Sequence, residues 1–402
     1  MPAPGAIEVC NQGVLHMPSG LMGWWELERD AFRRRIANKM ASMRNWRVGV
    51  LYGATSVEDG TYLRHKPSSQ LSVMDITRSF GNIGISSEWV DPTAPDFIAS
   101  LEGLDAAFLN THGPFGEDGN LQGLLAYLGI PYTGSGVAPS GVAADKRLMK
   151  LMLHGARVRT LPSQRVKPEW GVPDRLPSFP FMLKACLGGS SIGLSLVSSR
   201  SEFARALAEH AGQGFRDFII EPFVEGVAVT VPVLYFGGSA VMMPPLACKP
   251  AAVYYDGPSK LGCARGPSVE FQPIVDRSHP WVGPIHEAMH AICSALDFDG
   301  AIRADFLVEQ ASGEPIFLEI NTIPGVQKNS NLMLSAHALG IEDEEILAAI
   351  LASADNAEKL VPWRHVVHEP AACDGKAELP ILPGMELRDR LAGATHLRGG
   401  LR

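Results

Sequence analysis

The stretch AIRADFLVEQASGEPIFLEINTIPGVQKNSN, residues 301–331, decides the fold of this chain. Two short runs of β-forming residues, Ile302–Glu309 and Pro315–Asn321, flank a polar linker that contains Gly313. Runs of this kind on either side of a short Gly-containing linker predict a β-hairpin. The segment Thr322–Gly325 then breaks the second strand and starts a loop.

The pairing within this hairpin follows from its centre. If the hairpin is symmetric about Ser312, Asp305 lies opposite Glu319, and Arg303 lies opposite Asn321. Because side chains alternate along a strand, these four polar side chains project from one face. The other face is apolar and suits a core, with Ile302, Ala304, Phe306, Leu318 and Ile320.

The opposed carboxylates of Asp305 and Glu319 allow two interpretations. Like charges directly opposite each other destabilise a sheet, and a bound cation would remove that repulsion. Oxygen ligands from Asp, Glu and Asn suit Mg²⁺ better than Zn²⁺. The alternative is a solvated sheet face on which Arg303 pairs with both acids. The spacing alone favours neither interpretation.

These residues carry a family resemblance. Arg303-x-Asp305, followed by Glu319-x-Asn321-x-x-Pro-Gly325, resembles the metal-binding motif of ATP-grasp carboxylate–amine ligases. The resemblance implies that the Asp, Glu and Asn side chains bind Mg²⁺, with two ions expected, against the ATP phosphates. It also implies that Arg303 and the backbone of Gly325 hold the transition state.

The composition limits the possible partners and compartments. The 402 residues suffice for two or three domains, and 46% hydrophobic with 19% charged residues is ordinary for a globular protein. A net charge of -8 without a basic block argues against nucleic acid. Neither a membrane-spanning run nor a signal pattern is present, so we expect a cytoplasmic protein with no membrane partner. The cysteines are scattered without C-x-x-C spacing, which predicts reduced thiols.

The N-terminal part, residues 22–45, is predicted to be one helix. Its apolar residues recur at helical spacing, namely Trp25, Phe32, Ile36, Met40 and Met43. We expect an amphipathic helix packed on the body of the protein or on a second subunit, rather than on a membrane surface. We also expect a homodimer of this chain.

Strand and helix patterns then alternate. Apolar strand runs over Trp46–Gly53, Ile83–Val90 and Ala106–Asn110, with a helical pattern near Ser69–Phe80, predict an open parallel sheet. The Gly-rich polar loop Thr111–Gly119 follows immediately. Loops at the carboxyl ends of parallel strands are where such sheets bind ligands. Taken alone, its histidine could be an ordinary loop residue.

The motifs around this loop resemble one family closely. They are His112-Gly-x-x-Gly-Glu117-Asp-Gly-x-x-Gln-Gly, then Gly-Ile-Pro-Tyr-Thr-Gly-Ser-Gly136, then Asp145-Lys146, and they resemble the D-alanine–D-alanine ligase family. The resemblance implies a mixed α/β, three-domain ATP-grasp fold. The expected organisation is an N-terminal extension over 1–45, a Rossmann-like substrate domain over 46–140, a central lid over 141–226, a C-terminal domain with the metal site over 227–358 and a tail over 359–402.

The ATP contacts centre on a second Gly-rich loop, 187–193, which follows a predicted strand. Such a loop can wrap phosphate oxygens, although it is more often a plain turn, and this one lacks the ending of a P-loop. By the resemblance it covers the ATP phosphates, with Ser190 also at the reacting groups. The remaining implied ATP residues are Lys146, Lys184, Ser191 and Lys260 on phosphates, Glu221 on the adenine amino group and Val224 on the ring edge.

The resemblance also implies a set of substrate residues, namely Glu58, His112, Glu117, Arg303, Lys328 and Ser330. His112, Lys260 and Ser190 are implied in catalysis as well. The reaction expected is ATP-dependent amide formation through an acyl phosphate, with small carboxylic acids or amino acids and amines as substrates. Alternatives are a kinase that releases the acyl phosphate and a non-catalytic nucleotide-binding homologue.

The sequence departs from the family where substrates bind. Gly60 replaces an acid that holds the first substrate's ammonium, Leu261 replaces an aromatic residue, and Ala228 replaces an acid on the ribose. Lys328 is new, and either reads an additional anionic group or points to solvent. The departures predict a nonstandard amino acid or carboxylic acid as substrate. The alternative is a genuine D-alanine–D-alanine ligase of cell-wall synthesis.

Overall fold

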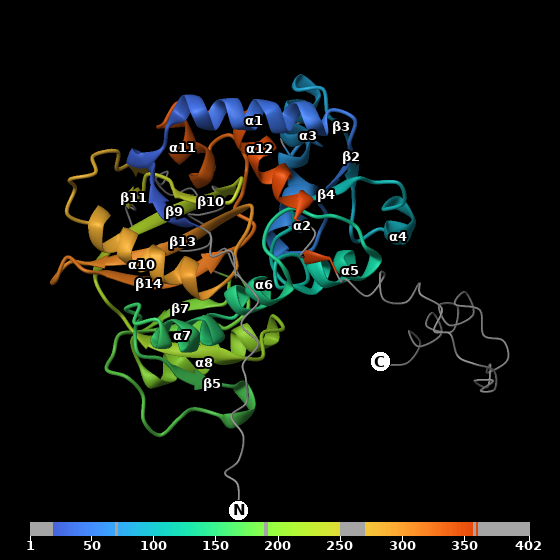
Figure 1. Ribbon diagram of the computed structural model, residues 1–402. Helices are drawn as coiled ribbons and strands as arrows, with labels where there is room; N and C mark the ends of the chain where they lie inside the picture. The colour runs from blue at the N-terminus through green and yellow to red at the C-terminus, as the bar shows by residue number, and fades with distance from the viewer. Residues whose placement is uncertain (1–18, 69–70, 189–191, 250–269, 357–358, 361–402) are drawn as a thin grey trace, which may run out of the picture. The chain divides into compact units, whose positions relative to one another are not determined.

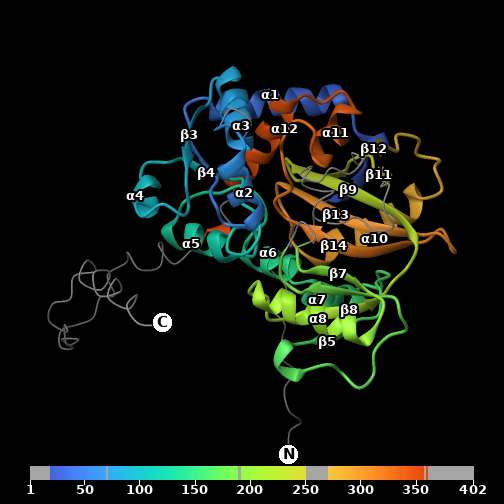
Figure 2. The ribbon, with the colours of Figure 1, turned by 180° about the vertical axis from the view of Figure 1, so that it is seen from behind.

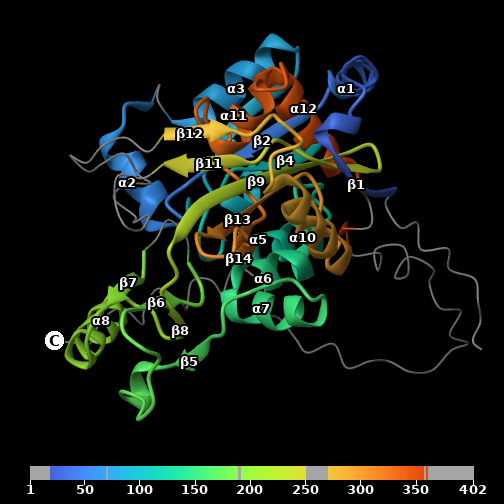
Figure 3. The same cartoon turned by 90° about the vertical axis from the view of Figure 1, so that its left-hand side faces the viewer.

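The longest strand, β9 (Gly226–Phe236), is the centre of the largest sheet (Figures 1 and 3). The computed structural model describes residues 19–68, 71–188, 192–249, 270–356 and 359–360. β9 pairs antiparallel along its length with β13 (Ala301–Glu309), which in turn pairs with β14 (Pro315–Asn321). The same sheet also contains β1 (Ser19–Gly23), β10 (Ser239–Met242), β11 (Leu246–Lys249) and β12 (Glu270–Pro273).

The predicted parallel sheet is confirmed. Its order is β3 (Ser86–Val90), β2 (Arg47–Leu51) and β4 (Ala106–Leu109), and both pairings are parallel. Helix α3 (Ser72–Asn82) packs on it through the fully buried Phe80, whose ring meets Phe108 edge-on. The loop that begins at Asn110 therefore starts at the carboxyl end of β4.

A separate four-stranded sheet forms the central part. Its order is β5 (Gln164–Val166), β8 (Phe218–Pro222), β6 (Phe181–Ala185) and β7 (Leu194–Val197). Helix α8 (Arg200–Gly212) covers one face of this sheet (Figure 2). The fully buried Phe203 of α8 packs against Phe181, so the helix closes a small core of its own.

The predicted hairpin register is confirmed at the end away from the connecting loop, and it shifts by one residue toward that loop. Asp305 pairs with Glu319, as predicted, but Phe306 pairs with Phe317. One residue on β13 is thus matched by two on β14, which makes Leu318 the extra residue of a β-bulge. Phe317 is buried in place of Leu318, so the prediction that Leu318 belongs to the core face was wrong.

The predicted N-terminal helix begins later than expected. Residues 19–23 form β1, which pairs with β10 in parallel, and helix α1 covers only Arg29–Met43. Trp25 lies in the short turn between them and contacts His286. The buried Phe32 and Ile36 turn α1 toward α12 (Asp343–Ala352), over which it lies in Figure 1. The helix therefore packs on the body of the same chain.

Two helical stretches are interrupted. Residues 137–155 form α6 (Val137–Ala144) and α7 (Lys146–Gly155), because Asp145 is extended and accepts hydrogen bonds from two amides of the first turn of α7. Residues 331–352 form α11 (Asn331–His337) and α12, divided near Gly340, whose φ is 70°. The other α-helices of the described residues are α2 (Val57–His65), α4 (Phe97–Ser100), α5 (Asn120–Leu128) and α10 (Val282–Ala295).

The described helices contain none that is long and apolar enough to cross a bilayer. Three cysteines lie in the described ranges, namely Cys186, Cys248 and Cys293, and Cys186 and Cys293 are free thiols, as predicted. Cys10, Cys263 and Cys373 lie outside the described residues.

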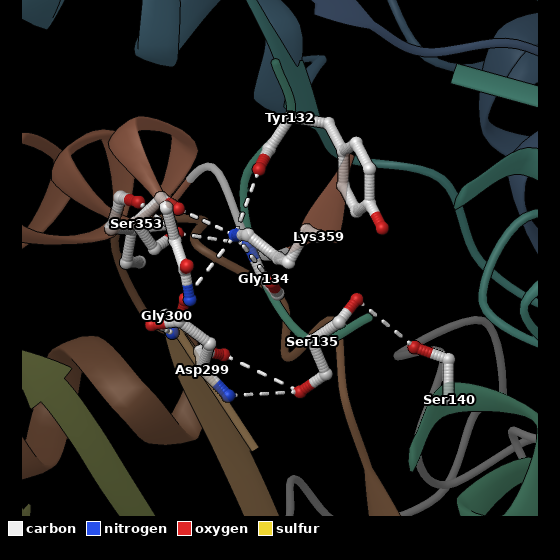
Figure 4. A network of polar contacts seen from close by, with 10 residues as sticks. Tyr132, Gly134, Ser135, Ser140, Asp299, Gly300, Ser353 and Lys359 are labelled. Carbon is white, nitrogen blue, oxygen red and sulfur yellow. Dashed lines mark hydrogen bonds and ion pairs between the residues drawn. The ribbon is translucent and has the colours of Figure 1, made fainter. Parts of the chain in front are cut away.

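Lys359, the first residue of the predicted tail, ties distant segments together (Figure 4). Its ammonium donates to the carbonyl oxygens of Tyr132 at 3.0 Å and Gly134 at 2.9 Å, and also to that of Ser353. It pairs with the carboxylate of Asp299 at 3.2 Å. Burial lowers the pKa of Lys359, although Asp299 acts to raise it.

Replacing Lys359 by Met is expected to lower the free energy of unfolding by about 3–5 kcal/mol, because it breaks a buried ion pair and leaves carbonyls without a donor. Urea unfolding followed by circular dichroism measures this loss. Lys328→Met is the control, since Lys328 is exposed and its replacement should change the unfolding free energy by less than about 0.5 kcal/mol. Equal stabilities of the two variants would contradict the role given to Lys359.

Candidate active site

The polar face of the hairpin carries an organised set of charges. The Nε of Arg303 lies 3.1 Å from Oδ1 of Asp305, and its Nη2 lies 3.2 Å from Oδ2, which makes a two-point ion pair. Thr230 of β9 donates to the same carboxylate from the neighbouring strand. Burial acts to lower the pKa of Arg303, but the Asp305 charge outweighs it and raises the pKa. Asp305 is thus held in one orientation.

Glu319 has a different cationic partner. The Nζ of Lys146, at the start of α7, lies 3.0 Å from Oε2 of Glu319 and 2.7 Å from the carbonyl oxygen of Gly188, to which it donates. Burial alone would lower the pKa of Lys146, and Glu319 outweighs burial and raises it. The two opposed acids are therefore neutralised by two different cations, not by Arg303 alone.

The donor set fits a magnesium ion. Asp305 and Glu319 each supply carboxylate oxygens and remain partly exposed, at 18% and 25% of their side chains. Asn321 adds an amide oxygen whose orientation is fixed by a 2.8 Å hydrogen bond from the amide of Ile323. All three side chains offer hard oxygen atoms on one sheet face, a donor set that suits Mg²⁺. Arg303 and Lys146 already place positive charge beside these two carboxylates, which shows that this face of the hairpin accommodates cations.

A second charge cluster lies in the central part. Glu221 of β8 is 1% exposed, and its Oε2 lies 2.8 Å from Nζ of Lys184 on β6. Its Oε1 contacts Nζ of Lys150 on α7. Burial would raise the pKa of Glu221, but Lys184 and then Lys150 outweigh burial and lower it. The sheet thus presents an ionised carboxylate between two lysines.

The loop after β4 meets the hairpin. The carbonyl of Glu117 accepts a 3.5 Å hydrogen bond from Thr322, the residue that follows β14. Its carboxyl Oε1 accepts from the amide of Gly113 at 3.0 Å, while Oε2 is buried and has no hydrogen-bond partner among the described residues. Burial raises the pKa of Glu117, although His112, Lys146 and Arg303 act to lower it.

His112 is oriented by a buried acid. Asp59 of α2 is 1% exposed and accepts a 3.2 Å hydrogen bond from the backbone amide of His112. The ring Nδ1 of His112 lies 3.2 Å from Oδ1 of Asp59. Asp59 stands next to Gly60, where the family's acid is missing, and in the structure it binds the histidine.

The remaining sequence-predicted residues divide into two groups. Val224 and Ala228 flank the start of β9, Gly325 lies in the loop after β14, Lys328 is exposed, and Ser330 caps α11 through the amide of Met333. Ser190, Ser191, Lys260 and Leu261, with the side chain of Glu58, lie outside the described residues.

Three residues of the charge clusters were not predicted. Lys150 and Thr230 carry no motif of their own, and Asp59 stands where the family resemblance expects no ligand. The available signal for Lys150 was its spacing, because residues four apart on a helix lie on the same face and Lys146 had already been assigned. Thr230 could be placed only by knowing that β9 pairs with β13.

Comparison with known proteins points to the family that the sequence motifs resemble. Family models described as D-ala D-ala ligase N-terminus and C-terminus match residues 61–135 and 172–352. A D-alanine–D-alanine ligase of Coprothermobacter proteolyticus is 35% identical over 294 residues, 70% of this chain and 91% of the relative. One from Cupriavidus pinatubonensis is 32% identical over 319 residues, with 77% and 91% covered.

Solved structures also resemble the chain. The crystal structure of the D-alanine–D-alanine ligase from Bacillus anthracis complexed with ATP aligns with a TM-score of 0.63 at 24% identity. The alignment covers 78% of this chain and 99% of that one. At this identity the likeness concerns the fold.

Proposed function

The chain belongs to the D-alanine–D-alanine ligase family, and from this premise we propose that it joins a carboxylate to an amine through an acyl phosphate. Its fold is the mixed α/β ATP-grasp fold expected from the sequence. Its enzyme class is that of ATP-dependent, ADP-forming carboxylate–amine ligases. The choice of substrates and the role of each side chain are our proposal.

One contact supports the proposal most strongly. Lys146 bridges Glu319 of the hairpin and the carbonyl of Gly188, the second residue of the Gly-rich loop 187–193. A cation that touches both segments lies between the predicted metal ligands and the predicted phosphate loop. A bound triphosphate with its Mg²⁺ would replace Glu319 and Gly188 as partners of this ammonium.

The proposed reaction requires the protein to neutralise the negative charges of its substrates. Two anions, the substrate carboxylate and the terminal phosphate of ATP, must approach each other, and transfer of the phosphoryl group gives the carboxyl a good leaving group. Asp305, Glu319 and Asn321 would hold Mg²⁺, which when bound screens the phosphate charge. Arg303 and Lys146 supply positive charge from the protein, and the amine then displaces phosphate. The family resemblance supports two ions and a homodimer.

The first substrate's ammonium requires an acceptor. Gly60 offers none, and Asp59 is already bound to His112. The buried Oε2 of Glu117, which has no hydrogen-bond partner in the described part of the chain, is a carboxylate oxygen near Arg303 and His112, and we propose that it takes this role. A different acceptor position favours a first substrate other than D-alanine. The names of the relatives support the competing candidate, D-alanine at both positions.

A substrate screen tests this choice. Purified protein with ATP and Mg²⁺ is given single amino acids of both configurations, simple carboxylic acids, and pairs of them, while phosphate release is followed. We expect the highest kcat/KM with a pair other than D-alanine alone. Fast turnover with D-alanine alone, yielding the homodipeptide, would refute the substrate proposal and leave the ligase class intact. Absence of ADP formation with every pair would refute the ligase proposal itself.

A further inference from the structure

Lys150 is a buried cation outside the residues given a role so far. It lies four residues after Lys146 on α7, so the two side chains share one face of the helix. Its side chain is 7% exposed. The ammonium donates to the carbonyl oxygen of Leu161 at 2.8 Å and contacts Oε1 of Glu221. Buried lysines of this kind are rare unless paired.

The two oxygens of Glu221 therefore have separate partners. Lys184 takes Oε2 and Lys150 takes Oε1. Lys184 is the more exposed of the two lysines, at 16% of its side chain. The family resemblance implies that it binds the ATP phosphates, for which it must leave Glu221. Lys150 is anchored by Leu161 and remains. In the nucleotide complex, Lys150 is thus the partner that stays on the carboxylate.

We propose that Lys150 is a positioning residue that holds Glu221 ionised and fixed, and thereby makes the site select adenine over guanine nucleotides. The inference rests on the proposed function and on the role that the family resemblance implies for Glu221, which is to receive the exocyclic amino group of adenine. An ionised carboxylate has only acceptors, and the adenine amino group donates to it. Guanine presents an oxo acceptor at the same ring position, so a carboxylate repels it. A neutral acid could donate to that oxo group and would lose the discrimination.

The size of the expected change in nucleotide preference follows from the buried polar groups that a mismatched base leaves without a hydrogen bond. Sites that hydrogen-bond a substrate group reject analogues without it by large factors, because their buried polar groups remain unpaired. Without Lys150, burial favours the protonated form of Glu221. We therefore expect Lys150→Met to reduce the ratio of GTP to ATP dissociation constants by at least about tenfold. A purely structural lysine would change stability without moving this ratio.

The experiment measures dissociation constants for ATP and GTP, each with Mg²⁺, by titration calorimetry. Wild type should prefer ATP strongly, and Lys150→Met should lose that preference. Lys150→Arg keeps the charge and should retain it. The matched control is Lys167→Met, which removes a lysine of the same part of the chain whose partner, Glu169, is exposed. This control should keep the wild-type ratio.

A second background keeps the test decisive if Lys150→Met folds poorly. Glu221→Gln is neutral, so Lys150→Met in that background creates no unpaired buried anion. We expect the added Lys150→Met change to leave the ratio of GTP to ATP dissociation constants of Glu221→Gln unaltered. A further fall in the ratio, or an unchanged ratio in a folded Lys150→Met single variant, would overturn the inference. Failure of the wild type to bind ATP would instead overturn the proposed function.

Discussion

Asp305→Asn and Glu319→Gln are each expected to lower the rate of ADP release by about 10²–10³-fold, the usual cost of removing one group that stabilises transition-state charge. Each change replaces an anionic oxygen with a neutral amide of the same size. The metal would then lose a charged ligand, while Arg303 and Lys146 keep polar partners. The fold should survive because both side chains are partly exposed.

A matched control lies on the same strand. Glu309, at the far end of β13, pairs with Arg159 at 2.7 Å, and Glu309→Gln should leave turnover within about twofold of wild type. Titration with Mn²⁺ in the presence of ATP, followed by electron paramagnetic resonance, gives a second readout. The two site variants should bind the ion more weakly. Wild-type turnover in both would place the metal elsewhere.

Arg303→Lys should lower kcat by about 10²-fold and leave the KM for ATP within about threefold. Arg303 makes a two-point contact with Asp305 through Nε and Nη2, and a lysine offers one compact charge instead of a planar fork. The positive charge beside Asp305 remains, so the hairpin should stay folded. Steady-state kinetics at saturating substrates separates the two constants.

The neighbouring ion pair again provides the control for this prediction. Arg159→Lys preserves the charge beside Glu309 at the end of the hairpin remote from Asn321 and should change neither constant appreciably. A raised KM for ATP with an unchanged kcat would show that Arg303 binds substrate and transition state equally. That result would remove its role in the transition state.

Local sequence patterns were sufficient to predict the hairpin at the centre of the candidate site. The pairing of Asp305 with Glu319 follows from the hairpin's symmetry, and a single assumed centre at Ser312 was correct for the first rungs. The bulge at Leu318 was not predictable, because both Phe317 and Leu318 are apolar and either could enter the core. Tertiary packing decided which one did, since Phe317 meets Phe306 edge-on.

Contacts between segments distant in sequence could not be predicted from local sequence patterns. The Lys146–Glu319 and Lys150–Glu221 pairs join residues about 170 and 70 positions apart, and nothing in either segment specifies its partner. The break at Asp145 was readable in principle, because an Asp before a helical run is a strong N-cap. Departures from a family motif, such as Gly60, showed where a side chain is missing but not which other residue replaces it.

The transfer of oxygen from the substrate carboxylate to phosphate tests the central claim most directly. Protein, ATP and Mg²⁺ are incubated with the best substrate pair from the screen, whose first member carries ¹⁸O in its carboxylate. Formation of an acyl phosphate and its displacement by the amine must leave one ¹⁸O atom in each phosphate released, with one amide bond made per ADP. Phosphate without ¹⁸O, with ADP formed at the same rate whether or not the amine is present, would contradict the account.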